Sequence, residues 1–224
     1  MAFGGYTVDV QTTKLPQKVA TGFNKCFENM MGASYEMIAY LGSKVVNGVN
    51  HAFLAKQTLI VGNDVKSIVF IILNEKPGDV AAETFSIVEI STLMSNGGGN
   101  NALGGISINP TTEIPDEAKA VFNKHFGGFL GANNIPFALL ATQMVHGGAY
   151  FFAVESTMVT SPGRMTSGKV KTINLVKVFS DFSEIESIEV LGGASAATLE
   201  ESKNESGSNG VLNYAFTWST KMWP

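Results

Sequence analysis

The sequence predicts an α+β protein built from two tandem copies of one unit, each a single helix packed on an antiparallel β-meander. The main observation is an internal repeat: Phe23-Asn24-Lys25 returns 99 residues later as Phe122-Asn123-Lys124. Gly32 returns as Gly131 at the same distance. A repeat of this length, present twice, is typical of a duplicated domain, because solenoids need at least three short units to bury a core.

We expect domain 1 to span residues 1–94 and domain 2 to span residues 102–192. The segment between them, 95–101, is rich in Gly and Asn and is typical of a flexible linker. Residues 193–224 follow as a polar, Gly/Ser-rich stretch and then an apolar C-terminal tail that begins at Val211. Each predicted domain, at about 100 residues, is large enough to bury a core without a metal or a disulfide.

Each copy is expected to begin with a short extended segment, at 6–10 and 106–108, followed by a helix. The helix is predicted by apolar residues that recur at the helical spacing and form one stripe. This stripe is Val19, Phe23, Cys26, Phe27 and Met30 in the first copy and Ala118, Phe122, His125, Phe126 and Phe129 in the second. Pro16 and Pro115 suit the first helical turn, where no N–H donor is needed. We expect Gly32 and Gly131 to end the helices as left-handed C-caps.

Four strands are expected after each helix, with turn residues between them. The predicted strands are 35–46, 49–61, 65–73 and 83–94 in the first copy and 134–145, 148–160, 169–179 and 184–191 in the second. Asn47-Gly48 is a strong hairpin signal, because both residues tolerate a positive φ. Alternate turns of an up-and-down sheet lie at the same edge. We therefore expect Asn47-Gly48, the Pro77-Gly78 loop and the N-terminal Gly4-Gly5 segment to lie together.

Composition and charge argue against several classes of function. The net charge is −4 and no cluster of Lys and Arg stands out, so no nucleic-acid partner is expected. A single cysteine excludes an internal disulfide and suits a reducing compartment, which predicts a cytoplasmic protein. The first residues lack the basic region and apolar run of a signal peptide. The expectation of a cytoplasmic protein still leaves unconventional secretion open. The apolar run 68–73 is too short to span a bilayer, so no membrane partner is expected.

Several motifs resemble the cystatins, and among them the stefins, which lack disulfides. Gly4-Gly5 looks like the N-terminal glycines of that family, and Gln143-Met144-Val145-His146-Gly147 looks like its Gln-x-Val-x-Gly hairpin. Lys44-Val45-Val46-Asn47-Gly48 resembles a second copy of this hairpin, with Lys44 in place of the glutamine. Residues 175–179 resemble the next stefin strand, and Pro77-Gly78 resembles the loop that follows that strand.

The resemblance covers both copies and implies two tandem cystatin-like domains that inhibit papain-like cysteine proteases. In that family an N-terminal segment and two hairpin loops form an apolar wedge that enters the enzyme's cleft. A preformed hairpin loses little entropy on binding, so a modest contact area can give high affinity. The residues expected to bind a protease are Gly4, Gly5, Lys44, Val45, Val46, Asn47, Gly48, Pro77, Gly78, Gln143, Met144, Val145, His146 and Gly147.

A second interpretation is a structural or assembly role for the same fold, with self-association into a homo-oligomer through the apolar tail. Trp218 and Trp223 would then dock on a neighbouring subunit as part of an added strand. The tail could equally fold back as an edge strand of the second copy, since sequential strands usually pair.

An enzyme is the least expected class, and no cofactor or metal is expected. Cys26 lies on the helical stripe that faces the sheet, where a cysteine is usually an inert apolar side chain. Cys26 and His51 are therefore not predicted to form a catalytic pair. The three histidines and the single cysteine show no metal-ligand spacing.

Overall fold

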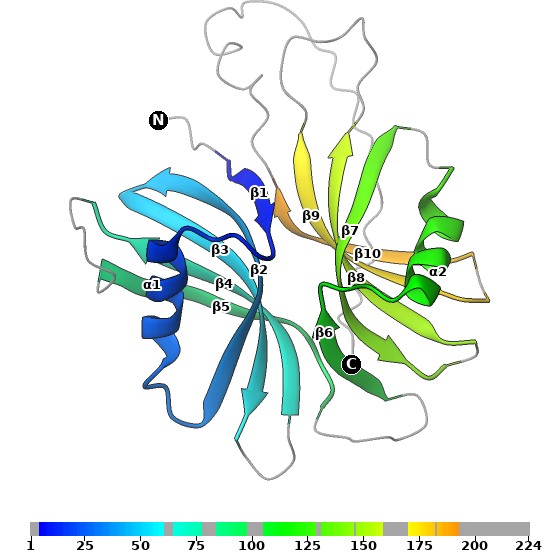
Figure 1. The fold of residues 1–224 in the computed structure, drawn as a ribbon, viewed down its shortest axis with the longest axis horizontal. Coiled ribbons are helices and arrows are strands. Elements are labelled where there is room, and N and C mark those ends of the chain that lie inside the picture. Colours follow the sequence, from blue (N-terminus) through cyan, green and yellow to red (C-terminus); the bar gives the residue numbers. More distant parts are fainter. Residues whose placement is uncertain are drawn as a thin grey trace, which may run out of the picture.

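The chain forms four layers, in which two antiparallel sheets pack face to face and one helix covers the outer face of each sheet (Figure 1). The computed structural model describes residues 5–60, 65–77, 84–97, 105–128, 131–145, 147–158, 170–181 and 183–192. Ten strands and two helices lie within these residues, so the described fold is mostly β. Neither helix in these ranges is long and apolar enough to cross a membrane.

Both halves of the chain have the same order of elements. The first half contains β1 (Thr7–Gln11), α1 (Gln17–Phe27), β2 (Ala33–Val46), β3 (Gly48–Leu59), β4 (Val65–Glu75) and β5 (Phe85–Ser95). The second half contains β6 (Ile106–Thr111), α2 (Asp116–Phe126), β7 (Ala132–Gln143), β8 (Ala149–Met158), β9 (Lys171–Phe179) and β10 (Ile185–Gly192). The strand order is β1-β2-β3-β4-β5 in one sheet and β10-β9-β8-β7-β6 in the other, so both sheets are meanders.

The two halves also share the irregularities of their strand pairing. Register shifts occur at Met37/Ala39 and Tyr40/Gly42 in the pairing of β2 with β3, and at Pro136/Ala138 and Leu139/Ala141 in that of β7 with β8. The shifts of the second sheet thus lie 99 residues after those of the first. Such irregularities bend a strand and increase its twist, so both sheets curve at corresponding places. The sequence repeat is therefore also a structural repeat.

The helices end earlier than the sequence suggests. The C-cap residues are Glu28 and Gly127, both in the right-handed helical region, and not Gly32 and Gly131 as predicted. The two predicted glycines do have positive φ values, of 87° and 106°, but each lies directly before β2 or β7. The positive φ thus turns the chain into the next strand rather than closing the helix.

Strand β3 shows how the first sheet is covered on both of its faces. Ala52 and Leu54 belong to the core between the two sheets, whereas Phe53 and Ala55 belong to the core beneath α1. All four side chains are buried. Since successive residues of a strand point to opposite faces, this pattern requires an apolar layer on each side of the sheet.

The core between the sheets is built by both halves of the chain. Its buried residues are Ile38, Ala39, Leu41, Ala52, Leu54, Ile68, Phe70 and Met94 from the first half and Ile108, Ala138, Leu140, Ala141, Phe151, Ala153, Ile173, Leu175 and Leu191 from the second. Two smaller cores lie outside it, one under α1 around Phe23 and Phe53 and one under α2 around Phe122 and Phe152. We refer to the first of these three as the inner core.

The prediction of two tandem cystatin-like domains, each a helix on its own meander, is wrong. The two five-stranded sheets bury their inner faces against each other, in a structure that is mostly β. One helix can cover only one face of a sheet, and the central strands are apolar on both faces. In β4, Val69 and Ile71 pack under α1 while Ile68 and Phe70 pack into the inner core. An unbroken apolar run is typical of a strand buried on both faces, and residues 68–73 form such a run.

Because the inner core joins both halves, we expect Phe151→Ala to destabilise the whole described fold in one step. The Phe151 ring is fully buried in this core, so its removal should lower the free energy of unfolding by about 3–5 kcal/mol. Urea unfolding followed by near-UV and far-UV circular dichroism should give one coincident transition with a lower midpoint. Val88→Ala, at an exposed side chain, is the control and should change stability by less than about 0.5 kcal/mol. Two transitions, of which only one moves, would show that the halves do not share a core.

Candidate functional site: the edge formed by the first hairpin

Three segments of the first half meet at one edge of its sheet. Thr7 of β1 pairs with Ser43 of β2, which carries the preceding residues Gly5 and Tyr6 alongside the end of β2. The Lys44 Nζ atom lies 5.9 Å from the centre of the Tyr6 ring. The predicted N-terminal segment therefore does reach the hairpin, although Gly4 lies outside the described residues.

The third segment is the end of β4, which lies against the tip of the β2–β3 hairpin. Gly48 has a φ of 99°, and a Cβ placed there would overlap the carbonyl oxygen of Glu75 and lie 3.3 Å from the Cδ atom of Pro77. Asn74 supports the same contact, because its Nδ2 atom donates a hydrogen bond of 2.7 Å to Oδ1 of Asn50. Only glycine allows the two backbones to approach so closely. We call residues 5–6, 44–48 and 77 the first edge; Gly78 lies outside the described residues.

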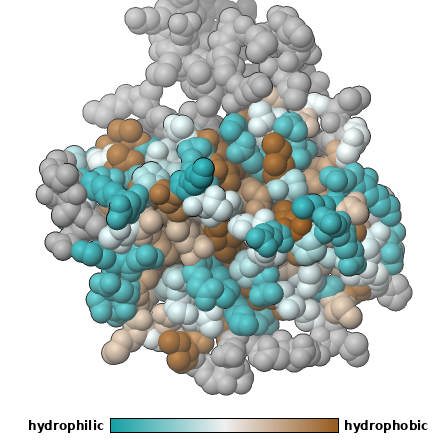
Figure 2. Space-filling model, viewed as in Figure 1, coloured by the Kyte–Doolittle hydropathy of each residue, from teal (hydrophilic) through white to brown (hydrophobic). Residues whose placement is uncertain are grey.

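The first edge exposes two apolar side chains on a paired strand. Val45 is 81% exposed and Val46 is 43% exposed, although both belong to the paired strand β2. On the face of the molecule shown in Figure 2, hydrophobic residues form separate small patches among hydrophilic ones. Isolated exposed apolar residues are common, so the pair is informative only because it adjoins two other converging segments.

A polar network lies directly behind this edge. The Lys18 Nζ atom of α1 lies 2.5 Å from Oε1 of Glu75, and His51 Nε2 lies 3.0 Å from Oε2 of the same carboxylate. The Tyr40 hydroxyl lies 3.3 Å from the other ring nitrogen, Nδ1 of His51. A carboxylate accepts hydrogen bonds only, so Nε2 of His51 carries a proton and donates it. The remaining ring nitrogen, Nδ1, faces the Tyr40 hydroxyl.

Electrostatics favours the ionised form of Glu75. Burial alone would raise the pKa of its carboxyl group, but hydrogen bonds from Lys18 and His51 and the charges of both outweigh burial, and the pKa lies below its ordinary value. Burial also raises the pKa of the Tyr40 hydroxyl, which therefore stays protonated as a donor. The network links α1, β2, β3 and β4 behind the hairpin. Sequence reasoning missed Lys18, Tyr40 and Glu75 as members of a site.

The predicted residues of the second half form a separate edge, on the second sheet. Ile106 pairs with Gln143, so Gly105 lies next to the start of the β7–β8 turn. Met144 is 84% exposed, and a Cβ on Gly147 would overlap the carboxylate of Asp181. Val145 is half-buried and His146 lies outside the described residues. We call residues 105, 143–145, 147 and 180–181 the second edge; it combines one exposed methionine with an acidic neighbour.

The second half holds its edge through different hydrogen bonds from those of the first half. In α2, Lys124 Nζ donates a 3.1 Å hydrogen bond to the carbonyl oxygen of Ser180, and His125 Nε2 lies 2.7 Å from the carbonyl oxygen of Phe179. The Ser180 hydroxyl donates a hydrogen bond to the carbonyl oxygen of Gly147. These contacts join the helix and the turn through main-chain carbonyls, without a carboxylate at the position that Glu75 occupies in the first half.

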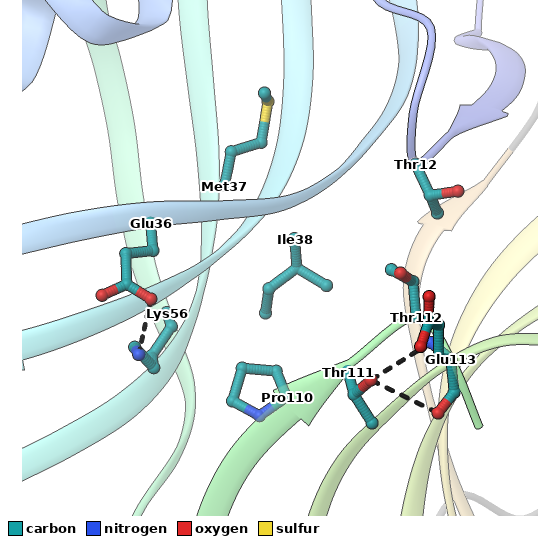
Figure 3. Close-up of a pocket in the computed structure, with 9 residues that line it drawn as sticks. All are labelled: Thr12, Glu36, Met37, Ile38, Lys56, Pro110, Thr111, Thr112 and Glu113. Atoms are coloured by element: carbon teal, nitrogen blue, oxygen red, sulfur yellow. Dashed lines mark hydrogen bonds and ion pairs between the residues drawn. The ribbon is translucent and has the colours of Figure 1, made fainter. Parts of the chain in front are cut away.

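A cleft of about 350 Å³ lies between the sheets and is a second candidate for a binding site. Figure 3 shows Ile38 and Pro110 between an ion pair on one side, where Lys56 Nζ lies 2.5 Å from Glu36 Oε2, and a threonine-rich turn on the other. In that turn the Thr111 hydroxyl accepts a 3.1 Å hydrogen bond from the Glu113 amide. Lys56, Glu36 and the Thr111 hydroxyl are thus already paired within the wall of the cleft.

The remaining candidate residues do not form a reactive centre. Cys26 is half-buried beside the core under α1, and burial raises the pKa of its thiol, which keeps the thiol protonated and unreactive. His51 is engaged by Glu75 and Tyr40. Within the described ranges no group of three or more His, Cys, Asp or Glu side chains could hold a metal ion. Trp218 and Trp223 lie outside the described residues, so self-association through the tail stays a prediction.

No protein-family model, no curated protein and no solved structure matches the chain. The resemblance to the cystatins therefore stays a prediction from the hairpin and glycine motifs.

The close approach at Gly48 gives a direct test of how the first edge is held. We expect Gly48→Ala to lower the free energy of unfolding by more than about 2 kcal/mol, because it combines a left-handed backbone with overlap against the Glu75 carbonyl oxygen. The matched control is Gly148→Ala in the other hairpin, where φ is 90° but nothing lies within 4 Å of the added Cβ. It should cost about 1–2 kcal/mol, the backbone contribution alone. If urea unfolding shows equal losses of unfolding free energy for Gly48→Ala and Gly148→Ala, the contact between β4 and the hairpin contributes nothing to the loss.

Proposed function

We propose that the chain inhibits papain-like cysteine proteases by placing its first edge in the active-site cleft of the enzyme. The observation that carries this proposal is the meeting of three segments at one edge: Gly5-Tyr6, the β2–β3 hairpin and Pro77. A cleft-binding protein needs a narrow projecting surface rather than a broad flat one. The three segments supply such a surface, and the 81% exposed Val45 supplies an apolar contact on it.

The chemistry of the edge suits a protein partner better than a small molecule. Its contacts come from valine and proline side chains and from the backbone of Gly5, which has no side chain to cover it. The paired strands already fix the hairpin, so binding would cost little conformational entropy. The positive φ of Gly48 bends the backbone away from an extended form, which would keep the tip from presenting a regular peptide bond for cleavage.

The first edge supports this function better than the second edge does. Met144 offers a comparable exposed apolar side chain, but the carboxylate of Asp181 lies against the neighbouring Gly147. A negative charge at the tip would be desolvated on entry into a cleft, and uncompensated burial of a charge is costly. We therefore assign the inhibitory contact to residues 44–48.

Titration of papain with the intact chain tests the proposal. We expect an inhibition constant below about 1 μM, and we expect Val45→Asp to weaken inhibition by about 30-fold or more, because a charge would replace an apolar contact at the centre of the interface. Val45 is exposed, so the substitution should leave the urea midpoint unchanged.

Met144→Asp is the matched control, because it introduces the same charge at an equally exposed hairpin residue of the other half. It should inhibit as the unchanged chain does. Absence of inhibition by the intact chain at tens of micromolar would refute the proposed function. Loss of inhibition in Met144→Asp but not in Val45→Asp would assign the contact to the second edge instead.

A further inference from the structure

Glu75 connects the first edge to the rest of the protein in two ways. Its carbonyl oxygen lies against Gly48, so its main chain contacts the hairpin tip directly. Its side chain is held by Lys18 from α1 and by His51 from β3. It is also the last residue of β4, directly before the segment that contains Pro77. One residue therefore contacts or adjoins two of the three segments that make up the edge.

The second half shows that this arrangement is not required by the fold. Strand pairing places Ser180 at the position of Glu75. In the first half Glu75 lies opposite Val49. The counterpart of Val49, 99 residues later, is Gly148, and its carbonyl oxygen accepts a hydrogen bond from the Ser180 amide. In the same way Glu117 stands where the first half has Lys18, and Tyr150 stands where it has His51. There the Tyr150 hydroxyl donates a 3.0 Å hydrogen bond to Glu117, and neither residue bonds to the end of β9 in that contact. The contact of Glu75 with Lys18 and His51 thus has no counterpart at these positions of the second half, where Ser180, Glu117 and Tyr150 stand instead.

We propose that Glu75 is the positioning residue of the first edge: its ionised carboxylate fixes the end of β4 to α1 and β3, and protonation of this carboxylate releases the hairpin tip. The inference deepens the proposed function, on which its consequence for protease binding rests. The positional claim itself concerns the free chain. Removal of the negative charge would leave Lys18 and His51 facing each other across a neutral group, without the partner that draws them to β4.

The direction of the pH effect follows from the charges around the carboxylate. Lys18 on α1 and His51 on β3 face it, and Tyr40 on β2 lies behind His51, with Asp9 of β1 acting on Tyr40. The folded pKa of Glu75 is lowered from its ordinary value of 4.5. The tether therefore stabilises the fold in full above that value and is lost as the pH falls through the lower, folded pKa. The first edge should be firmly held at neutral pH and should loosen as the pH falls below the ordinary carboxyl value of 4.5.

Backbone NMR of the intact chain between pH 7 and pH 3 tests the positional claim without a protease. The amide signals of residues 147–150 lie beside the carboxylates of Asp181 and Glu117, so Glu75→Gln should leave their titration unchanged. The amide signals of residues 46–50 should show a midpoint below the ordinary value of 4.5. Glu75→Gln should abolish this titration and should speed hydrogen exchange at Val49 and Asn50 about tenfold at neutral pH, as expected for the loss of a charge-assisted hydrogen bond.

Lys18→Gln is the second variant, and it keeps the test decisive if Glu75→Gln does not fold. It removes a charge that lowers the pKa of Glu75 but leaves the carboxylate in place, so the midpoint should move upward. A purely structural role for Glu75 would not shift a midpoint in this way. Identical titration curves in the intact chain and in Lys18→Gln, or no titration of residues 46–50 at all, would overturn the inference.

Papain inhibition at neutral pH separates the two proposals. If the intact chain inhibits papain, Glu75→Gln should weaken inhibition about tenfold, although this variant keeps the contact residue Val45. Inhibition that is insensitive to Glu75→Gln would refute the positioning role and leave the proposed function intact. Conversely, a chain that does not inhibit papain but whose 46–50 signals titrate with Glu75 would refute the proposed function and support the positioning role.

Discussion

The burial of two apolar sheet faces against each other is the constraint on which the rest of this structure depends. Each sheet has side chains on two faces, and its helix covers one of them. The second face is covered by the other half of the chain, through the inner core. Apolar area removed from water contributes about 25 cal/mol per Å², so a sheet face left exposed would forfeit a large part of the stability of the fold. The two halves are thereby joined in one body, despite the flexible composition of the segment between them.

Burial on both faces also explains why the edges are the places where function is expected. The central residues of β3, β4 and β8 are committed to packing, and their side chains are inaccessible. The described strand ends and turns at the two edges are free of this demand and carry exposed side chains such as Val45 and Met144. Because the strands beneath them are rigid, such turns are presented in fixed positions. Binding residues placed on a loop over a firm scaffold are a common solution in proteins.

Local patterns in the sequence predicted the elements well and their assembly poorly. The helical stripe around Phe23 and the Asn47-Gly48 turn depend on neighbours within a few residues, and both lie in the elements expected. The packing of one sheet on the other depends on which faces are apolar, and the unbroken apolar run 68–73 does not indicate what covers its second face. The helix ends were misplaced because Gly32 and Gly131 could serve either as caps or as turns into a strand. The Lys18–Glu75 contact joins residues 57 positions apart, and no motif marks such a pair.

The inner core carries a consequence for how such a chain could arise. A polypeptide holding only one repeat would have an uncovered apolar sheet face, and the nearest available cover is the same face of a second molecule, related by two-fold symmetry. Fusion of two such genes converts that association between molecules into a permanent one, independent of concentration. Once fused, the partners are free to diverge. The acidic tether behind one hairpin and the serine at the corresponding place behind the other are the kind of asymmetry that a symmetric dimer of identical subunits could never evolve.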